Sequence, residues 1–215
     1  MKNFLVLLLA ALLVVPAVEM DAKNRQLAKA QKKEYKQKMK EFKKSKWTLL
    51  GSSHSLEVAL LKHYDKLNAE GENCYEVVGI APRFKSKNVG HQETINNACI
   101  TYAQQAGSSV KGRITSDIAG NGDDTSAEFD HFYAAYERLV EKEIKGEMVE
   151  SFSIIRTIDK KTGEYEMQTF FIIDESAATR ARIRAMENAL KESETAQKYA
   201  EKVSLFVREE FESQE

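Results

Sequence analysis

Residues 147–173 read EMVESFSIIRTIDKKTGEYEMQTFFII and predict a β-hairpin. Two runs rich in apolar and β-branched residues, 147–158 and 164–173, flank the polar segment DKKTG, whose glycine supplies the turn. We expect Phe152 to pair with Phe171, because this register gathers apolar residues on one face of the hairpin. That face would consist of Met148, Ile154, Ile158, Tyr165 and Ile173. The hairpin therefore predicts an antiparallel sheet at the centre of the fold.

Three further strands are expected. Residues 47–50 and 74–84 are apolar runs, and over 110–118 apolar residues alternate with charged ones, as in a strand solvated on one face. Helical spacing of apolar residues predicts helices from Ser53 or Ser55 to about Asn68, over 88–106 with Gly107 as its cap, over 125–145, and over 176–212. We expect an α+β fold, a mostly antiparallel sheet of about five strands with helices on one face, a basic N-terminal helix and a long C-terminal helix.

The predicted C-terminal helix would be roughly 55 Å long, which exceeds the width of a domain of this size. Small residues that suit close helix packing recur along it: Ala178, Ala181, Ala185, Ala189, Ser193, Ala196 and Ala200. A small sheet cannot cover this length, so we expect contacts with another protein or a second copy of the chain along residues 189–211.

Residues 1–17 have the pattern of a secretory signal peptide. Twelve unbroken apolar residues, 4–15, are followed by small residues at the −3 and −1 positions of a cleavage site, Val15 and Ala17. The apolar run is shorter than the roughly 20 residues that span a bilayer. Basic charge after an apolar segment opposes translocation, so an uncleaved anchor that faces the cytoplasm is the alternative. The expected organisation is a signal peptide (1–17), a basic helix (18–46) and a single α+β domain (47–215) ending in the long helix.

Charge is divided unevenly along the chain. Residues 23–46 hold eleven Lys or Arg and two Glu, a net charge of +9, whereas the chain from residue 47 onward has a net charge of −9. The basic helix can pair with acidic residues of the C-terminal helix, or it can attract anionic lipid head groups or polysaccharide. Export argues against nucleic acid as its partner. The lysines expected to contact an anionic partner are Lys29, Lys32, Lys33, Lys36, Lys40, Lys43 and Lys44.

The sequence carries no catalytic signature. Residues 117–128 match four positions of an EF-hand calcium loop, but Ala119 stands where an oxygen ligand is needed, and a capping box at 125–128 explains the final acid. The segment GSSHS, 51–55, lacks the second glycine of a nucleophile elbow. Surface or helix-face positions are expected for the histidines, which lack the paired spacing of metal ligands: His54, His63, His91 and His131. We therefore predict no enzymatic activity, no metal and no cofactor.

The two cysteines are expected to be buried thiols. The predicted strand places Cys74 at its far end, and the helix that returns along it places Cys99 midway. Their distances from the shared turn then differ by roughly 20 Å. This difference is far beyond the reach of a disulfide.

Two segments carry a resemblance to a known family. The hairpin and its sequel read IIRTIDKKTGEYEMQTFFIIDESAATRARIRAMENAL, and an earlier strand and helix read YEVVGIAP … NNACITYAQQAGSSVKGRI. This combination, roughly residues 74–200, resembles the exported envelope proteins grouped around the twenty-kilodalton Helicobacter-type lipoprotein (LPP-twenty-like). The resemblance implies a small α+β envelope domain without known catalysis, often associated with the outer membrane or larger assemblies. The chain lacks that family's lipid-accepting cysteine, and its basic helix and residues 47–68 are additions.

Together these features predict an exported, non-enzymatic cell-envelope protein of structural or protein-interaction type, in the periplasm or at the cell surface of a Gram-negative bacterium. Its expected partners are other envelope proteins, or a second copy of itself through the C-terminal helix. The alternative function is a binding module for an anionic glycan or lipid that uses the basic N-terminal helix.

Overall fold

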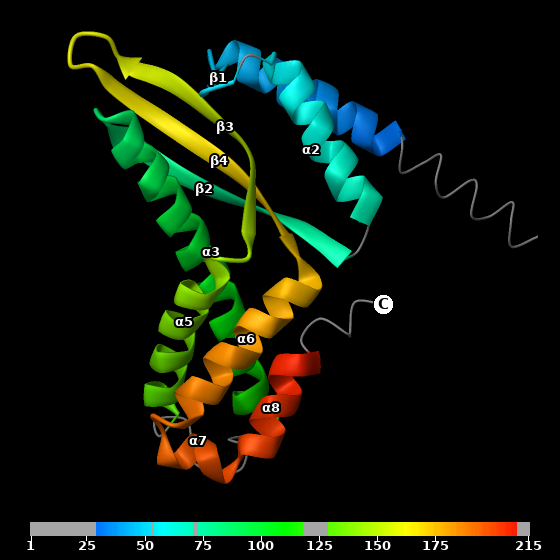
Figure 1. Cartoon of the computed structure of the whole chain (residues 1–215), viewed down its shortest axis with the longest axis vertical. Helices are drawn as coiled ribbons and strands as arrows, with labels where there is room; N and C mark the ends of the chain where they lie inside the picture. Colours follow the sequence, from blue (N-terminus) through cyan, green and yellow to red (C-terminus); the bar gives the residue numbers. More distant parts are fainter. Residues whose placement is uncertain (1–28, 53, 71–72, 118–128, 210–215) are drawn as a thin grey trace, which may run out of the picture. The chain divides into compact units, whose positions relative to one another are not determined.

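The computed structural model describes residues 29–52, 54–70, 73–117 and 129–209 (Figure 1). The chain divides into two compact units, Met1–Trp47 and Thr48–Glu215. Among the described residues, the first unit contributes one helix, and the second contains a sheet with its helices.

In the first unit residues 29–44 form the helix drawn in blue in Figure 1. Two backbone hydrogen bonds close its end: the Trp47 amide donates to the Phe42 carbonyl (3.0 Å), and the Lys46 amide donates to the Lys43 carbonyl (3.2 Å). Lys46 has a φ of 59°, the left-handed conformation that this Schellman-type turn requires. The helix thus ends two residues before the end predicted from the sequence.

The second unit is built on an antiparallel sheet. Its strands are β1 (Thr48–Leu49), β2 (Cys74–Phe84), β3 (Met148–Asp159) and β4 (Glu164–Asp174). Over the described residues the sheet has four strands in the order β1-β3-β4-β2, and every neighbouring pair is antiparallel. The α+β class and the antiparallel sheet are confirmed, whereas the prediction of a fifth strand is wrong.

The segment expected to form that fifth strand is helical. It belongs to α3 (Lys87–Asp117), which continues where a helix over 88–106 and then a strand over 110–118 were predicted. Val110 and Ile114 are fully buried. Their spacing of four residues fits one face of a strand and one face of a helix equally well, so the apolar pattern did not distinguish the two. The final residue of the predicted strand lies outside the described residues.

Gly107 does not cap a helix, because α3 continues through it. At this point α3 packs against α5 (Asp130–Ile144), and a Cβ added to Gly107 would lie 2.3 Å from Cγ of Glu137. The glycine is therefore explained by the close approach of two helices, not by a helix end.

β3 and β4 form the predicted hairpin, with Gly163 at a φ of 68° in its turn. The predicted register is wrong by one residue: Phe152 pairs with Phe170 instead of Phe171, and the two paired rings stack with centroids 4.4 Å apart. The pair next to the turn, Asp159–Glu164, keeps the predicted register, and an irregularity between Thr157 and Asp159 shifts the following pairs, Phe152–Phe170 included, by one residue. A β-bulge between Glu150 and Phe152 then adds a further residue to β3.

The bulge also divides the apolar face that the sequence predicted. Met148 and Ile173 pair with each other and pack in the main core. Ile154, beyond the bulge, points to the opposite face of the sheet, because successive side chains alternate. Ile158 is 42% exposed, and Tyr165 packs in a separate small cluster.

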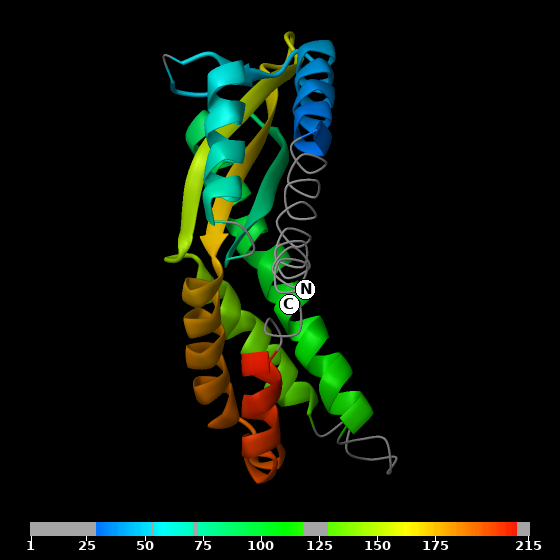
Figure 2. The ribbon, with the colours of Figure 1, turned by 90° about the vertical axis from the view of Figure 1, so that its right-hand side faces the viewer.

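Helices cover both faces of the sheet, which corrects the expectation of helices on one face (Figure 2). On one face lies α2 (Leu56–Glu70), whose His63 ring contacts the Phe170 ring. On the other lies α3, whose Thr94 hydroxyl contacts the Thr169 hydroxyl. Five successive residues of β4 are buried, as expected for a strand between two layers.

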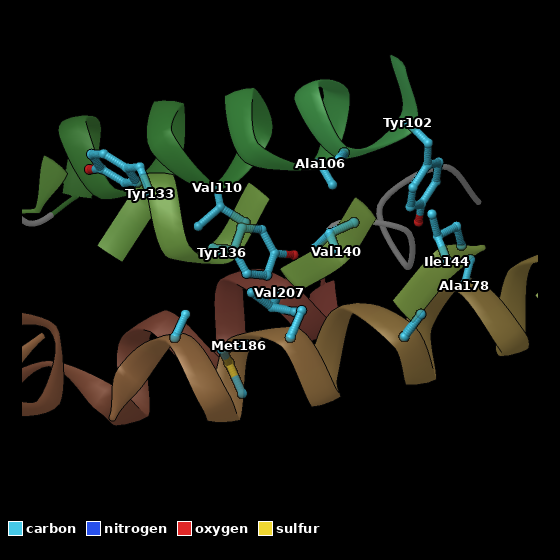
Figure 3. Packing of buried hydrophobic residues seen from close by; sticks show 14 of the residues in the cluster. Tyr102, Ala106, Val110, Tyr133, Tyr136, Val140, Ile144, Ala178, Met186 and Val207 are labelled. Atoms are coloured by element: carbon cyan, nitrogen blue, oxygen red, sulfur yellow. The ribbon is translucent and has the colours of Figure 1, made fainter. Parts of the chain in front are cut away.

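The main core lies where the second half of α3 meets α5, α6 (Glu175–Leu190) and α8 (Ala200–Glu209) beyond the end of the sheet (Figures 1 and 3). The helix predicted over 125–145 is observed from residue 130, and residues 118–128 lie outside the described part of the chain. Its predicted apolar residues are all buried in this core: Phe129, Phe132, Tyr133, Tyr136, Val140 and Ile144.

The C-terminal segment does not form the single long helix predicted from the sequence. It is broken into α6, α7 (Glu194–Lys198) and α8. The Ser193 hydroxyl accepts a hydrogen bond from the Ala196 amide (3.2 Å), and the Gln197 side chain donates to the Leu190 carbonyl (2.8 Å). Ser193 therefore acts as an N-cap that begins a new helix, a role that its place among the regularly spaced small residues did not indicate.

Because of this break, α8 folds back onto α6 and α3. The Arg113 guanidinium donates to the Phe206 carbonyl (3.3 Å), and Val203 and Val207 are fully buried. Six of the seven small residues that were expected to pack closely are buried: Ala178, Ala181, Ala185, Ala189, Ser193 and Ala196. The expectation of partner contacts along 189–211 rested on an uncovered 55 Å helix, and the structure removes that basis.

The prediction of two buried thiols is confirmed. Cys74 and Cys99 are both buried, and they form no disulfide. Burial raises the pKa of the Cys99 thiol to about 11, so this sulfur is held in its neutral form at physiological pH.

Candidate functional site: a lysine stripe on helix 29–44

Seven exposed lysines share one face of helix 29–44. With about 100° of rotation per residue, their positions all fall within an arc of about 120°. We call this set the lysine stripe: Lys29, Lys32, Lys33, Lys36, Lys40, Lys43 and Lys44. They are the residues that the sequence analysis assigned to an anionic partner, and the helix brings all seven to one side.

The other faces of this helix differ in chemistry. Tyr35, Met39 and Phe42 form an apolar line about 120° away from the centre of the lysine stripe. Glu34 and Glu41 occupy a third side, about 130° from the centre in the other direction. Within residues 29–44 no acidic side chain therefore interrupts the lysine stripe.

The helix concentrates its charge over a short length. Residues 29–46 contain nine lysines and two glutamates, a net charge of +7. The helical part is about 24 Å long, about three times the screening length of roughly 8 Å at physiological ionic strength. Neighbouring lysines of the stripe thus act together on any anionic surface that they face.

The second unit has a surface pocket of about 380 Å³ beside the bulge of β3. Its polar lining includes Ser52, His54, Lys62 and Glu150. Ser52 accepts a hydrogen bond from the His54 backbone amide (3.1 Å), so this serine and histidine make a local turn contact and not a nucleophile–base pair. Across the described residues, no three His, Cys, Asp or Glu side chains gather as metal ligands.

The four histidines do not converge on one site. His54 and His131 are exposed, as predicted. His63 was expected at the surface or on a helix face, but it is fully buried among the rings of Tyr64, Phe152 and Phe170, with Nε2 2.5 Å from a Glu76 carboxylate oxygen. Its burial follows from the second helical layer, which the sequence did not predict.

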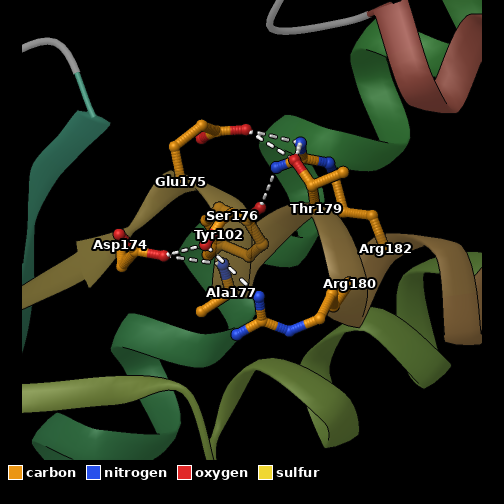
Figure 4. Close-up of polar contacts among 8 residues, drawn as sticks. All are labelled: Tyr102, Asp174, Glu175, Ser176, Ala177, Thr179, Arg180 and Arg182. Carbon is orange, nitrogen blue, oxygen red and sulfur yellow. Dashed lines mark hydrogen bonds and ion pairs between the residues drawn. The ribbon is translucent and has the colours of Figure 1, made fainter.

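A buried arginine at the junction of β4 and α6 was also missed (Figure 4). Arg182 is fully buried and donates to the Glu175 carboxylate (2.7 Å), the Thr179 hydroxyl (2.6 Å) and the Tyr102 hydroxyl (2.6 Å). Burial is the main cause that raises the pKa of Tyr102. This network ties α6 to α3, which fits a structural role. The spacing of Glu175, Thr179 and Arg182 on one side of α6 is its only sequence signal.

The calcium-loop candidate at 117–128 and the predicted signal peptide at 1–17 fall on residues outside the described part of the chain, apart from Asp117. Among the described helices, none combines the length and the apolar character needed to cross a bilayer. No protein-family model, no curated protein and no solved structure matches this chain significantly.

Proposed function

We propose that this chain is a non-enzymatic protein of the cell envelope that attaches to anionic lipid head groups through the lysine stripe. The observation that carries the proposal is the set of seven exposed lysines on one side of helix 29–44, uninterrupted by acid. The signal-peptide pattern and the resemblance to LPP-twenty-like proteins support export to the periplasm or cell surface of a Gram-negative bacterium.

The one-sided arrangement favours a membrane surface over a flexible polymer. A straight helix can present an arc of about 120° to a plane, so that all seven ammonium groups approach it together. Glu34 and Glu41 then point away from that plane, whereas a polymer that wraps the helix would meet them. Each lysine near an anionic membrane contributes about 1 kcal/mol of attraction.

Contacts with other envelope proteins are the second part of the proposed role. These contacts would be made by the acidic second unit, whose charge is opposite to that of the first. Self-association along an uncovered 55 Å helix no longer has a geometric basis, because α8 folds back and buries Val203, Phe206 and Val207, although Leu205 is 52% exposed.

The experiment uses the processed chain, which is expected to begin at Val18, and vesicles of phosphatidylglycerol mixed with phosphatidylcholine. The stripe variant replaces Lys32, Lys36, Lys40 and Lys43 by Gln. The matched control makes the same change of charge at four exposed lysines of the second unit: Lys85, Lys160, Lys161 and Lys198. Glutamine keeps a high helix propensity, so the helix is preserved.

The stripe variant should bind anionic vesicles about a hundredfold more weakly or worse, and the control should bind like the wild type. Neutral vesicles should bind neither protein. Equal binding by the stripe variant and the wild type would contradict the proposal. Tighter binding to a soluble anionic polysaccharide than to vesicles would replace the lipid by a glycan as the partner.

A further inference from the structure

A continuous chain of side-chain contacts runs between α3 and the sheet, outside the lysine stripe. Glu150 Oε1 lies 2.6 Å from the Ser153 hydroxyl, which lies 2.9 Å from the Thr169 hydroxyl, which in turn lies 2.7 Å from the Thr94 hydroxyl. Thr94 Oγ1 is also 2.7 Å from the backbone carbonyl of His91. We call Glu150, Ser153, Thr169 and Thr94 the hydroxyl chain.

The hydroxyl chain lies where α3 approaches β2 closely. A Cβ added to Gly79 of β2 would be 1.8 Å from the Thr94 carbonyl oxygen, so only glycine permits this approach. Thr94 and Thr169 are fully buried, and Ser153 is 3% exposed. The outer end is more open: the Glu150 side chain is 39% exposed and its Oε2 lies 2.8 Å from His91 Nε2.

The hydroxyl chain has one hydrogen fewer than its contacts require when Glu150 is ionised. Four oxygen–oxygen contacts link Glu150 Oε1 to the His91 carbonyl. Each contact at such a distance needs a hydrogen between the two oxygens. Three hydroxyl groups supply three hydrogens, and the carbonyl at the inner end supplies none. If Glu150 is ionised, one contact therefore lacks a hydrogen, whichever way the hydroxyl groups rotate.

We propose that the junction of α3 with the sheet is a pH-sensitive element, which becomes fully hydrogen-bonded only when Glu150 takes up a proton on Oε1. The O–H group of the protonated carboxyl then donates to the Ser153 hydroxyl, and Ser153 donates to Thr169. Thr169 donates to Thr94, and Thr94 donates to the His91 carbonyl. Glu150 Oε2 still accepts from His91 Nε2. With Glu150 ionised, a buried contact between two hydroxyl groups opens or is strained where α3 packs closely on β2.

Three basic side chains face Glu150. His91 contacts it from α3, and Lys62 of α2 and His54 of the preceding loop line the same pocket. The number of hydrogens available to the buried oxygen–oxygen contacts does not depend on these side chains, and the experiment below separates the two effects.

The test replaces Glu150 by Gln, whose amide nitrogen supplies the missing hydrogen to Ser153 at every pH while its oxygen accepts from His91. In urea unfolding of the processed chain near pH 7.5, Glu150→Gln should raise the folding equilibrium constant about fivefold. This gain should shrink as the pH is lowered towards about 4, where protein carboxyl groups take up protons. Glu187→Gln, the same change at an exposed position of α6, is the matched control and should show no such gain.

The Thr169→Val variant separates the effect of the missing hydrogen from other effects of removing the Glu150 charge. In Thr169→Val, Ser153 can donate to Glu150 and Thr94 to the His91 carbonyl, so no contact lacks a hydrogen. The gain from Glu150→Gln should then vanish in the double mutant. An unchanged or lowered stability of Glu150→Gln near pH 7.5, or a gain that persists in the Thr169→Val background, would overturn the proposal.

Discussion

At the scale of single residues, the stability of the fold depends on the pairing of the buried Arg182. Its guanidinium has no solvent exposure, whereas the Glu175 side chain that pairs with it is 20% exposed. Attraction within such a pair offsets the cost of removing two charges from water only while both partners are present. Truncating one partner leaves the other charge buried and uncompensated.

We therefore expect Glu175→Ala to lower the free energy of unfolding by about 3 kcal/mol, because it leaves the Arg182 charge inside the core. Urea unfolding followed by circular dichroism measures the loss. Glu201→Ala, at an exposed site of α8, serves as the control and should change the stability by less than about 0.5 kcal/mol. A loss below about 1 kcal/mol for Glu175→Ala would show that Arg182 does not depend on this partner.

Asp174 links stability to pH at the start of α6. Its carboxylate accepts hydrogen bonds from the Ser176 hydroxyl (2.5 Å) and the Ala177 amide (2.9 Å), and these bonds lower its pKa below the ordinary value of 3.8. Because the folded chain lowers this pKa, the ionised form stabilises the fold. That contribution is complete above pH 3.8 and is lost as the pH falls through the folded-state pKa.

Asp174→Ala should thus cost about 1 kcal/mol at neutral pH through loss of the N-cap. The cost should shrink in acid, below the ordinary pKa of 3.8. Unfolding curves at a series of pH values measure it. Asp174→Asn, which keeps an acceptor but does not ionise, should retain most of the cap without this dependence. A cost for Asp174→Ala that grows in acid would contradict the assignment.

At the scale of elements, the sequence predicts the hairpin, β2 and the aromatic face of α5, since each combines a clear apolar period with turn or cap residues. It does not predict the irregularity between Thr157 and Asp159 that moves Phe152 onto Phe170, or the bulge between Glu150 and Phe152, because the apolar period marks neither extra residue. The second half of α3 was missed because Val110 and Ile114 fit either period.

The lysine stripe and the hydroxyl chain also differ in whether the sequence predicts them. The lysine stripe follows from local sequence, since seven lysines at helical spacing suffice to define it. The hydroxyl chain does not, because Thr94, Ser153 and Thr169 come from three segments and meet only in the folded sheet; Thr94 and Thr169 are separated by 75 positions. Neither apolar periodicity nor any short motif marks such residues.

The break between α6 and α7 yields a prediction for Ser193. Replacing it by Ala removes the acceptor for the Ala196 amide, and we expect a loss of about 1 kcal/mol with α8 protected less strongly from hydrogen exchange. Ser193→Asp, which keeps an N-cap oxygen, should restore both. Higher helix content together with higher stability in Ser193→Ala would indicate instead that 176–209 prefers one continuous helix.

At the scale of the whole molecule, the two compact units suggest separate tasks. The second unit contains all the described strands and the main core. A chain beginning at Trp47 should therefore fold by itself, with a cooperative thermal transition and near-ultraviolet circular dichroism of fixed aromatic side chains. Loss of that transition would show that the basic helix is required for folding.

The same truncated chain separates attachment from internal pairing. If the lysine stripe attaches the protein to anionic surfaces, truncation should abolish vesicle binding. If the stripe instead pairs with acidic residues of the second unit, truncation should lower the melting temperature, by about 2–4 °C for each kcal/mol lost, and leave binding unchanged.

The most direct test of the central claim is vesicle binding by the wild-type processed chain as a function of salt. Attraction between the lysine stripe and phosphatidylglycerol is electrostatic, so the dissociation constant should rise steeply between about 0.02 M and about 0.2 M salt as the screening length falls. The stripe variant should show a much shallower rise. Binding that does not change with salt, or no binding to anionic vesicles at low salt, would contradict the account.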